Sequence, residues 1–284
     1  MVPQDMASIG VIVKPSSKKA EEVALRVLET LEKSGIEPLV EEESWNSYHS
    51  LKRFRPFRLE DSPERVIVVG GDGTLLHTVM KLRRPDTVIM TVRAGKRGFL
   101  LDVEPYEVEE RVYDFLAGNY RVYEYMRLRV KPPQHPSVCV LNDAVFVANR
   151  AKLVSLMIDV DGVRAMNLDG DGVIVSTTAG STAYSLSAGG PIVDPSLEVV
   201  IITPLNPVQL HLRPIVTRSD STVQVVVSPS SNSLYLSLDG QVGVDLYPGD
   251  LVKIERCEHP ARIARFKWWE NHFERIYTRI YSYI

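Results

Sequence analysis

The sequence predicts an α/β plus all-β protein: an N-terminal α/β lobe with a mostly parallel sheet, then a lobe resembling a β-sandwich. Before about residue 120, continuous apolar runs alternate with segments of helical periodicity, which is typical of a parallel sheet covered on both faces. From residue 121, apolar and polar residues alternate with the period of half-buried strands. A last helical pattern indicates a C-terminal helix that returns to the first lobe. The predicted domains are residues 1–120, 121–260 and 261–284.

The first lobe opens with a strand, a helix and a second strand. The apolar run at residues 9–13 predicts the first strand. Ser16 or Ser17 can cap the helix that follows, and Gly35 is suited to end it. The second strand is expected near Leu39. The apolar face of the helix consists of Ala20, Val23, Ala24, Val27, Leu28 and Leu31.

The rest of the first lobe adds a loop, two strands and a helix. Residues 45–63 are polar and basic with little periodicity, which predicts a loop. The continuous apolar runs at 66–69 and 88–92 predict buried strands. Apolar residues between 106 and 116 have helical spacing, so a helix is expected there.

The second lobe is expected to consist of short strands. Met126, Leu128 and Val130 alternate with basic residues, as in a half-buried strand. Asp161-Gly162 tolerates positive φ angles and predicts a two-residue hairpin. Further strands are predicted at residues 138–147, 173–176, 199–202, 223–227, 234–238 and 251–255.

The end of the chain has aromatic and aliphatic residues in roughly helical spacing between 266 and 280. This pattern predicts a helix that packs on the first lobe. Its apolar positions are Trp268, Trp269, Phe273, Ile276 and Ile280.

Composition excludes several classes of protein. The 284 residues are 44% hydrophobic and 24% charged, which is ordinary for a globular chain and unlike disordered or collagenous sequences. No apolar run reaches the roughly 20 residues that span a bilayer, and a net charge of −3 gives no reason to expect nucleic acid as a partner. We therefore expect a cytoplasmic protein with no membrane partner. Cys139 and Cys257 are expected to be buried thiols, although one bridge between them stays open.

The strongest local feature is the turn Gly70-Gly71-Asp72-Gly73, which follows the apolar strand and precedes helical spacing. Glycines allow a phosphate to approach the main-chain N–H groups, and a helix N-terminus favours anions. A carboxylate beside bound phosphates is electrostatically unfavourable unless it binds a metal or takes a proton, so Asp72 is a candidate catalytic base. The alternative is that Gly-Asp-Gly only makes a tight turn, as most such tripeptides do.

Three other phosphate-binding or catalytic motifs do not fit the sequence. A dinucleotide fingerprint that starts at Gly71 would need glycine at Leu76, and no Gly-Lys-Ser/Thr has a glycine five residues before the lysine. No Gly-x-Ser-x-Gly elbow occurs in the segment 171–191. Neither a dehydrogenase, a P-loop ATPase nor a serine hydrolase is supported.

A second feature is the segment 171–191, in which a strand leads into small hydroxyl residues and glycines. Small residues leave room for a ligand, and hydroxyls can bond a base or a ribose. Tyr184 can offer a ring face. The alternative is a plain Ser/Thr-rich loop or helix cap, which composition alone favours.

The third feature is Asn142-Asp143 inside the otherwise apolar run 138–147. Buried polar groups need partners, since an unpaired one costs about 1–3 kcal/mol. The pair therefore serves either the structure or a polar ligand, and the local pattern leaves both open.

Together, these segments resemble the NAD kinase family in order and in compatible spacing. The resemblance spans most of the chain and rests on Gly70 to Thr74, Gly98-Phe99-Leu100, Leu141-Asn142-Asp143 and the run from Asp171 to Pro191. The glycine turn alone is only moderately specific, because diacylglycerol and sphingosine kinases and relatives of phosphofructokinase have similar turns. The Ser-Thr-Ala-Tyr-Ser-Leu-Ser-Ala-Gly-Gly-Pro run is far more specific.

The resemblance implies a cleft between two lobes in which ATP, or polyphosphate, phosphorylates the 2′-hydroxyl of the adenosine ribose of NAD. Asp72 would take the proton, and a magnesium ion would arrive with the nucleotide rather than in a dedicated metal site. Nucleotide contacts would come from Gly70, Gly71, Gly73, Thr74, Phe99, Asn142, Asp143, Asp171, Thr182, Ala183, Tyr184, Ser187 and Gln241. His77 is a weaker candidate that fits a surface histidine equally well. Family members suggest a homodimer or homotetramer.

Some positions depart from the family pattern. Asp143 stands where glutamate is usual, and Thr178-Ala179 replaces Pro-Ser or Pro-Thr, which removes one hydroxyl. Asp169 stands where a basic residue is common. Arg93 replaces an uncharged residue and is either a contact to the phosphate donor or a solvated side chain.

Two rival functions are kept. A lipid kinase of the diacylglycerol or sphingosine type shares the glycine turn, but it needs an apolar slot where residues 182–187 are small and polar. A non-catalytic NAD(P) sensor would bind the dinucleotide without making NADP. The sequence decides neither ATP against polyphosphate nor NAD against NADH.

Overall fold

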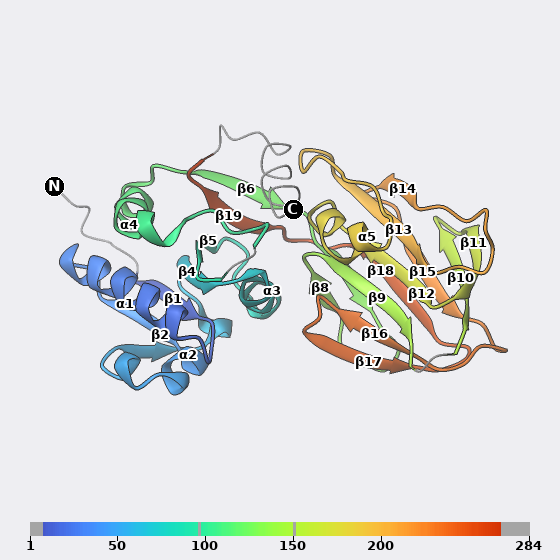
Figure 1. The fold of residues 1–284 in the computed structure, drawn as a ribbon, viewed down its shortest axis with the longest axis horizontal. Coiled ribbons are helices and arrows are strands. Elements are labelled where there is room, and N and C mark those ends of the chain that lie inside the picture. Colours follow the sequence, from blue (N-terminus) through green and yellow to red (C-terminus); the bar gives the residue numbers. More distant parts are fainter. Residues whose placement is uncertain (1–7, 96–97, 150–151, 268–284) are drawn as a thin grey trace. The chain divides into compact units, whose positions relative to one another are not determined.

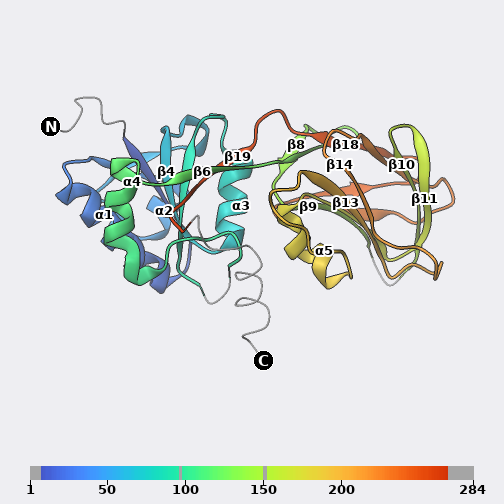
Figure 2. The same ribbon diagram turned by 90° about the horizontal axis from the view of Figure 1, so that it is seen from above.

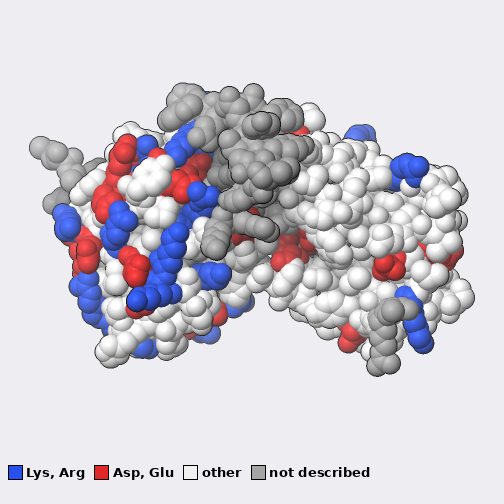
Figure 3. Space-filling model, viewed as in Figure 1, with Lys and Arg blue, Asp and Glu red and all other residues white. Residues whose placement is uncertain are grey.

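The computed structural model describes residues 8–95, 98–149 and 152–267, and the chain divides into two compact units (Figure 1). The first unit combines the chain before Tyr125 with the chain after Pro260, and the second is Tyr125–Pro260. In the described part of the chain, no helix has the length and apolar character needed to cross a membrane. On the face shown in Figure 3, Lys and Arg side chains of the first unit lie among Asp and Glu, so this face forms no uniform basic surface.

The first unit is built on a seven-stranded sheet in the order β3-β2-β1-β4-β5-β19-β6. The pairs from β3 through to β19 are parallel. Their apolar runs are buried, as expected for strands covered on both faces. The strands are β1 Ile9–Val13, β2 Pro38–Glu41, β3 Arg55–Phe57, β4 Arg65–Gly70, β5 Val88–Arg93, β6 Arg121–Tyr125 and β19 Ala261–Arg265.

Helices cover both faces of this sheet. Helix α1 (Lys18–Lys33) begins where the Ser17 hydroxyl accepts a hydrogen bond from Ala20 N, and Gly35 follows its end with a φ of 75°. Its apolar face joins α4 (Val108–Ala117) in one core with the sheet. Helix α3 (Asp72–Lys81) lies on the other side of the sheet (Figure 2).

Two predictions for this unit were wrong in part. Residues 45–63 are not a plain loop: α2 (Glu42–Ser47), β3 and two 3₁₀ turns, His49–Leu51 and Leu59–Asp61, lie there or overlap it. Their burial depends on contacts with distant elements, which periodicity does not reveal. Residues 261–265, assigned to the C-terminal helix segment, form β19 beside β5, with Ile263 and Ala264 buried. The helix predicted at 266–280 lies almost wholly outside the described residues.

The second unit contains two antiparallel six-stranded sheets, in the orders β11-β10-β15-β18-β7-β8 and β14-β13-β12-β9-β16-β17. Buried and more exposed residues alternate along β15 and β16, as in sheets with one face in a core. The strands are β7 Leu128–Lys131, β8 Val138–Val140, β9 Asp143–Ala148, β10 Val154–Val160, β11 Val163–Gly170, β12 Gly172–Ser176, β13 Val199–Leu205, β14 Ile215–Arg218, β15 Val223–Val227, β16 Leu234–Leu238, β17 Val242–Leu246 and β18 Leu251–Arg256.

The hairpin predicted at Asp161-Gly162 is confirmed. These residues have φ angles of 50° and 80° and join β10 to β11. In contrast, the single strand predicted at 138–147 is wrong. The chain leaves one sheet after β8 and enters the other at β9, so Leu141 and Asn142 form the crossing between the two sheets.

The default expectation of two buried thiols was wrong, and the bridge that the sequence left open is present, because Cys139 and Cys257 form a disulfide. Cys139 lies in β8, and Cys257 directly follows β18. The two cysteines are 118 residues apart in sequence, but β7 pairs with both β8 and β18 and brings their Cα atoms to 6.0 Å. This separation suits a disulfide.

Loss of this bridge should destabilise the second unit. We expect the Cys139→Ser/Cys257→Ser variant to lose about 2–4 kcal/mol of unfolding free energy, because the bridge restricts the unfolded chain. Urea unfolding with and without dithiothreitol measures the difference. Reductant should shift the wild-type midpoint and leave the double variant unchanged. An equal response of both proteins to the reductant would contradict the prediction.

Candidate functional site

The glycine turn joins β4 to α3 at the carboxyl end of the parallel sheet. None of its three glycines has a positive φ, so a left-handed backbone is not what requires glycine here. Gly70 is required by packing, because a Cβ there would collide with the Thr74 side chain. A Cβ at Gly71 or Gly73 would have no heavy atom within 4 Å. The fold therefore does not explain why these two positions lack a side chain.

The N-terminus of α3 leaves main-chain donors available. Thr74 N and Leu75 N both donate to the Gly71 carbonyl, at 3.0 and 3.2 Å. Among the described hydrogen bonds, none uses the N–H of Asp72 or Gly73. Unpaired N–H groups in the first turn of a helix, together with its dipole, favour an anion.

The Asp72 carboxylate is held by the second motif of the first unit. Asp72 Oδ2 accepts from Phe99 N at 2.8 Å, and Oδ1 accepts from Leu100 N at 3.1 Å. Phe99 thus contributes its main chain, 27 residues away in sequence. The structure brings these two predicted segments together and fixes the orientation of the carboxylate.

Two residues that sequence reasoning missed anchor this loop. Arg265 Nη1 donates to the Leu100 carbonyl at 2.9 Å and lies 3.4 Å from Asp102 Oδ1. Both side chains are almost fully buried. Asp102 also accepts from Phe266 N at 2.8 Å, so the loop is tied to the end of β19. No local pattern marks Arg265 or Asp102, because their partners lie more than 160 residues apart.

His77 and Arg93 are not brought to Asp72 by any described contact. His77 Nε2 lies 3.5 Å from Glu43 Oε2 of α2, within ion-pair distance. The two atoms do not form a hydrogen bond. Arg93 pairs with Glu104 and is neither a free cation nor fully solvated. The ion pair with Glu104 accounts for Arg93, and His77 lies beside a carboxylate of α2.

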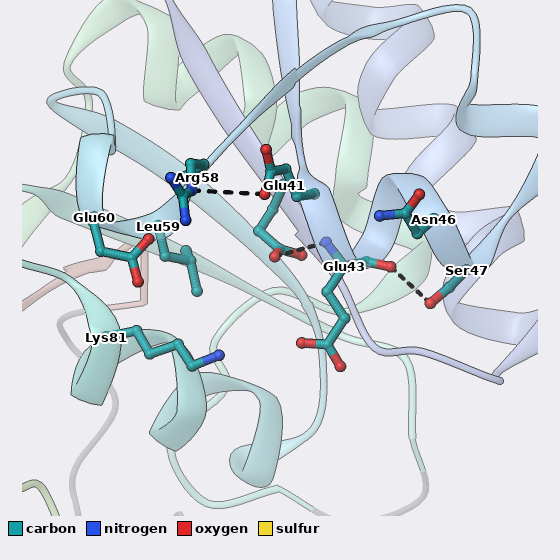
Figure 4. Close-up of a pocket in the computed structure, with 9 residues that line it drawn as sticks. Glu41, Glu43, Asn46, Ser47, Arg58, Leu59, Glu60 and Lys81 are labelled. Carbon is teal, nitrogen blue, oxygen red and sulfur yellow. Dashed lines mark hydrogen bonds and ion pairs between the residues drawn. The ribbon is translucent and has the colours of Figure 1, made fainter.

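A polar cavity of about 520 Å³ lies beside α2 and the end of α3 (Figure 4). None of the predicted site residues lines it. The carboxylates of Glu41, Glu42, Glu43 and Glu60 outnumber the cations of Arg58 and Lys81, so the cavity repels phosphates. The glycine turn is the better phosphate site of this unit, because its main-chain donors favour anions. The remaining lining residues are Asn46, Ser47 and Leu59.

In the second unit, the Leu141–Asp143 segment is held from two sides. Asp239 accepts hydrogen bonds from the N–H groups of Leu141, Asn142 and Asp143 at 2.6, 2.8 and 3.0 Å. Thr177 holds the other side: its hydroxyl donates to the Leu141 carbonyl at 2.6 Å, and its N–H donates to the Asn142 carbonyl at 2.9 Å. The main chain at this crossing between the sheets is thereby fully engaged.

The side chains on this segment are less satisfied than its main chain. Asn142 and Asp143 are 8% and 6% exposed. Asn142 Oδ1 and the neighbouring Ser176 hydroxyl have no hydrogen-bond partner among the described residues. No described hydrogen bond or ion pair involves the Asp143 carboxylate. Burial and the negative charge of Asp239 raise the pKa of Asp143 to about 7. Such buried, unsatisfied groups are the ones a polar ligand would complete.

The hydroxyl-rich segment packs directly against this crossing. It forms a 3₁₀ turn, Ala179–Thr182, and a short helix, α5 (Tyr184–Ser187). A Cβ on Gly180 would overlap the Asn142 carbonyl oxygen, so the turn and the crossing meet through their main chains. Tyr184 is 48% exposed. Of the other predicted contacts here, Thr182 and Ala183 are half-buried and Ser187 is exposed.

Of the two remaining predicted contacts, Gln241 lies near the crossing and Asp171 does not. Gln241 follows Asp239 by two residues and donates to its carbonyl at 3.4 Å, so it borders the crossing. Asp171 precedes β12, whereas Ser176 at the far end of β12 pairs with Asp143. Five residue steps along an extended chain separate Asp171 from Ser176 by about 16 Å. Asp171 accepts from Asn206 Nδ2 at 2.8 Å, and no contact joins it to Asn142.

The departures at Asp169 and Thr178 have structural partners. Asp169 accepts from Ser155 Oγ and from Gln209 Nε2, which replaces the need for a basic neighbour. Thr178 Oγ1 donates to the Leu197 carbonyl. Within the described residues, no group of three or more His, Cys, Asp or Glu side chains is arranged to hold a metal ion.

Comparison with known proteins gives consistent matches to both halves. The model of the ATP-NAD kinase N-terminal domain matches residues 9–120, and that of the ATP-NAD kinase C-terminal domain matches residues 141–266. An NAD kinase of Aeropyrum pernix is 52% identical over 278 residues, covering 97% of this chain and 99% of its own length. An NAD kinase of Thermococcus gammatolerans is 37% identical over 260 residues, covering 90% and 93%.

Two solved structures share the fold over nearly the whole chain. An NAD kinase from Archaeoglobus fulgidus in complex with ATP is 26% identical, with a TM-score of 0.77, and the match covers 97% of this chain and 99% of that one. The yeast NADH kinase complexed with NADH is 23% identical, with a TM-score of 0.86 and coverage of 97% and 87%.

Proposed function

The chain belongs to the ATP-NAD kinase family, and from this premise we propose that it transfers a phosphate from ATP to the 2′-hydroxyl of the adenosine ribose of NAD. The products are ADP and NADP. One observation carries the proposal: a carboxylate, Asp72, is fixed by two main-chain N–H groups at a glycine turn whose own donors favour phosphate.

The position of the turn in the sheet supports a phosphate site. From β1, the chain passes to β2 on one side, and from β4 it passes to β5 on the other. In open α/β sheets, ligands bind outside the carboxyl ends of the strands where the order reverses in this way. The turn follows β4 at this place, and Lys14 follows β1 beside it, with its Cβ 3.1 Å from a Cβ built on Gly70.

The proposed chemistry at this turn is proton removal and phosphate alignment. The N–H groups of Asp72 and Gly73 would bind the donor phosphates, and the Asp72 carboxylate would take the proton of the attacking hydroxyl. Each carboxylate oxygen can accept more than one hydrogen bond, so the bonds from Phe99 and Leu100 orient Asp72 without using it up. A magnesium ion held by the donor phosphates would neutralise charge during transfer. Asp72 is the one carboxylate in the sequence of the turn, so it is the residue there that could contact the magnesium ion.

We propose that NAD is bound by the second unit. Asn142 and Asp143 offer buried polar groups without partners, and the turn and short helix at 179–187 border them. Thr182, Ala183, Tyr184 and Ser187 would enclose the adenosine, with Gln241 beside the crossing. The case for Asp171 rests on the family resemblance alone, because it lies at the far end of β12.

The direct test is incubation with NAD, ATP and magnesium, followed by detection of NADP with an NADP-specific dehydrogenase. Parallel reactions with NADH and with polyphosphate define the acceptor and the donor. A rise in melting temperature with NAD but no NADP would mean a sensor rather than a kinase. Phosphorylation of diacylglycerol instead of NAD would mean a lipid kinase. A cytoplasmic location and a homodimer or homotetramer remain part of the proposal, and light scattering checks the latter.

The proposed phosphate site at the glycine turn can be tested separately at Gly73. Because a Cβ at Gly73 meets no protein atom, Gly73→Ala should keep the melting temperature within about 2 °C. It should nevertheless raise KM for ATP about tenfold, because the methyl group would occupy space next to the N–H groups that bind phosphate. Steady-state kinetics with varied ATP measures this. An unchanged KM for ATP would show that phosphate does not approach Gly73.

A further inference from the structure

Three buried charged side chains of the second unit are grouped around the crossing between its sheets: Arg127, Asp143 and Asp239. Charged groups are seldom this buried unless they have a specific role. The proposed function uses only Asp143. Asp239 and Arg127 are left to be explained.

Asp239 comes from the turn after β16, close to one hundred residues from the segment it holds. Both of its oxygens are used by the three N–H groups of Leu141, Asn142 and Asp143. Its own N–H donates to the Asp143 carbonyl at 3.0 Å. Asp239 and Gly240 have φ angles of 51° and 66°, a left-handed conformation that Asp and Gly tolerate in the turn between β16 and β17. A side chain held in this way sets where the crossing lies.

Arg127 is a buried cation of the same region. It is 9% exposed, and its charge and that of Asp239 attract each other. Its Nη2 donates to the Cys139 carbonyl at 2.8 Å, and its own carbonyl accepts from Cys257 N at 2.8 Å. The disulfide therefore joins the two residues whose main chains contact Arg127.

We propose that Asp239 is a positioning residue for the acceptor nucleotide: it fixes the Leu141–Asp143 main chain so that the Asn142 and Asp143 side chains face NAD. This inference rests on the proposed function for the identity of the nucleotide. Asp239 itself uses its oxygens on the protein main chain and acts through its two neighbours.

The negative charge of Asp239 also affects the pKa of Asp143. Asp239 is the charged group that acts on Asp143, and together with burial it raises the pKa of Asp143 to about 7. Arg127 acts on Asp239. Removal of the Asp239 charge should therefore lower the pKa of Asp143, and this shift changes the pH dependence of NAD binding only if the Asp143 carboxylate takes part in binding. The pH midpoint of NAD binding reports this difference.

The experiment compares Asp239→Asn with Asp239→Glu by calorimetric titration of NAD between pH 5 and 9. We expect Asp239→Asn to raise Kd for NAD at least tenfold, to leave KM for ATP within about twofold, and to move the pH midpoint of Kd downward. Asp239→Glu keeps the charge but displaces the oxygens, so it should weaken NAD binding and keep the midpoint. Asp250→Asn, which removes the charge of another turn carboxylate that accepts from a main-chain N–H, that of Tyr247, is the matched control and should bind NAD normally.

The outcomes separate the inference from the function. If the wild-type protein neither binds NAD nor makes NADP, the proposed function fails. If the wild type does both, and folded Asp239→Asn binds NAD with unchanged Kd and midpoint, the positioning role is wrong. Should Asp239→Asn not fold, Asp239→Glu decides alone: unchanged Kd for NAD overturns the proposal, and weaker binding with an unchanged midpoint supports it.

Discussion

Asp72→Asn is expected to lower kcat for NADP formation by about 100-fold or more, the usual effect of losing a general base. Asparagine has nearly the same shape, and its amide oxygen can still accept one of the two main-chain hydrogen bonds from Phe99 and Leu100. It cannot accept a proton from the ribose hydroxyl. KM for ATP and for NAD should change much less than kcat, because neither is proposed to depend on proton removal.

The comparison needs a matched substitution and a measure of folding. Asp86→Asn removes an exposed acid of the same unit that pairs with Arg84, and it should leave kcat unchanged. Circular dichroism and the melting temperature should show that both variants fold. Near-normal turnover in folded Asp72→Asn would exclude Asp72 as the base.

Gly180→Ala is expected to lower kcat/KM for NAD by about 100-fold, since displacement of binding groups by about 1 Å has effects of this size. The added methyl group would overlap the main-chain oxygen of Asn142, which cannot move without breaking its bond from Thr177 N. Overpacking of this kind should also reduce stability by about 1–3 kcal/mol. KM for ATP should stay unchanged, because the proposed phosphate contacts belong to the first unit.

The control for Gly180→Ala must lose stability without touching the crossing. Gly162→Ala does this: Gly162 has a φ of 80° and open space around it, at the β10–β11 hairpin. It should lower the melting temperature while NAD kinetics stay normal. Equal effects of the two variants on kcat/KM for NAD would mean that general stability, rather than the position of Asn142, controls the reaction.

Residues close together in sequence were sufficient to predict the two kinds of architecture. Continuous apolar runs separated by helical patterns marked the parallel sheet around β1, β4 and β5, and the two-residue signal at Asp161-Gly162 marked a hairpin. The glycine turn was located at the correct junction of strand and helix. These features depend on interactions within a few residues, such as burial period and turn conformation, so the sequence shows them directly.

The sequence did not show why particular residues occupy the glycine turn and the 138–147 segment. The glycines of the turn do not adopt positive φ, and Gly70 is set by contact with Thr74 and Lys14 rather than by the turn itself. The strand predicted at 138–147 breaks at Asn142, because Asp239 and Thr177 take the hydrogen bonds that a continuous strand would use. The apolar pattern of residues 138–147 is the same whether the segment forms one strand or two.

By itself, the sequence determined the α/β character of the first unit and the all-β character of the second, the place of the glycine turn and the polar pair at residues 142–143. Only the tertiary structure decided that Phe99 orients Asp72, that Asp239 holds Asn142, that the cysteines pair and that β19 returns to the first sheet. The physical reason is that a local pattern records which residues prefer burial or a turn. Hydrogen bonds and packing between distant segments form only when the whole chain has placed them side by side.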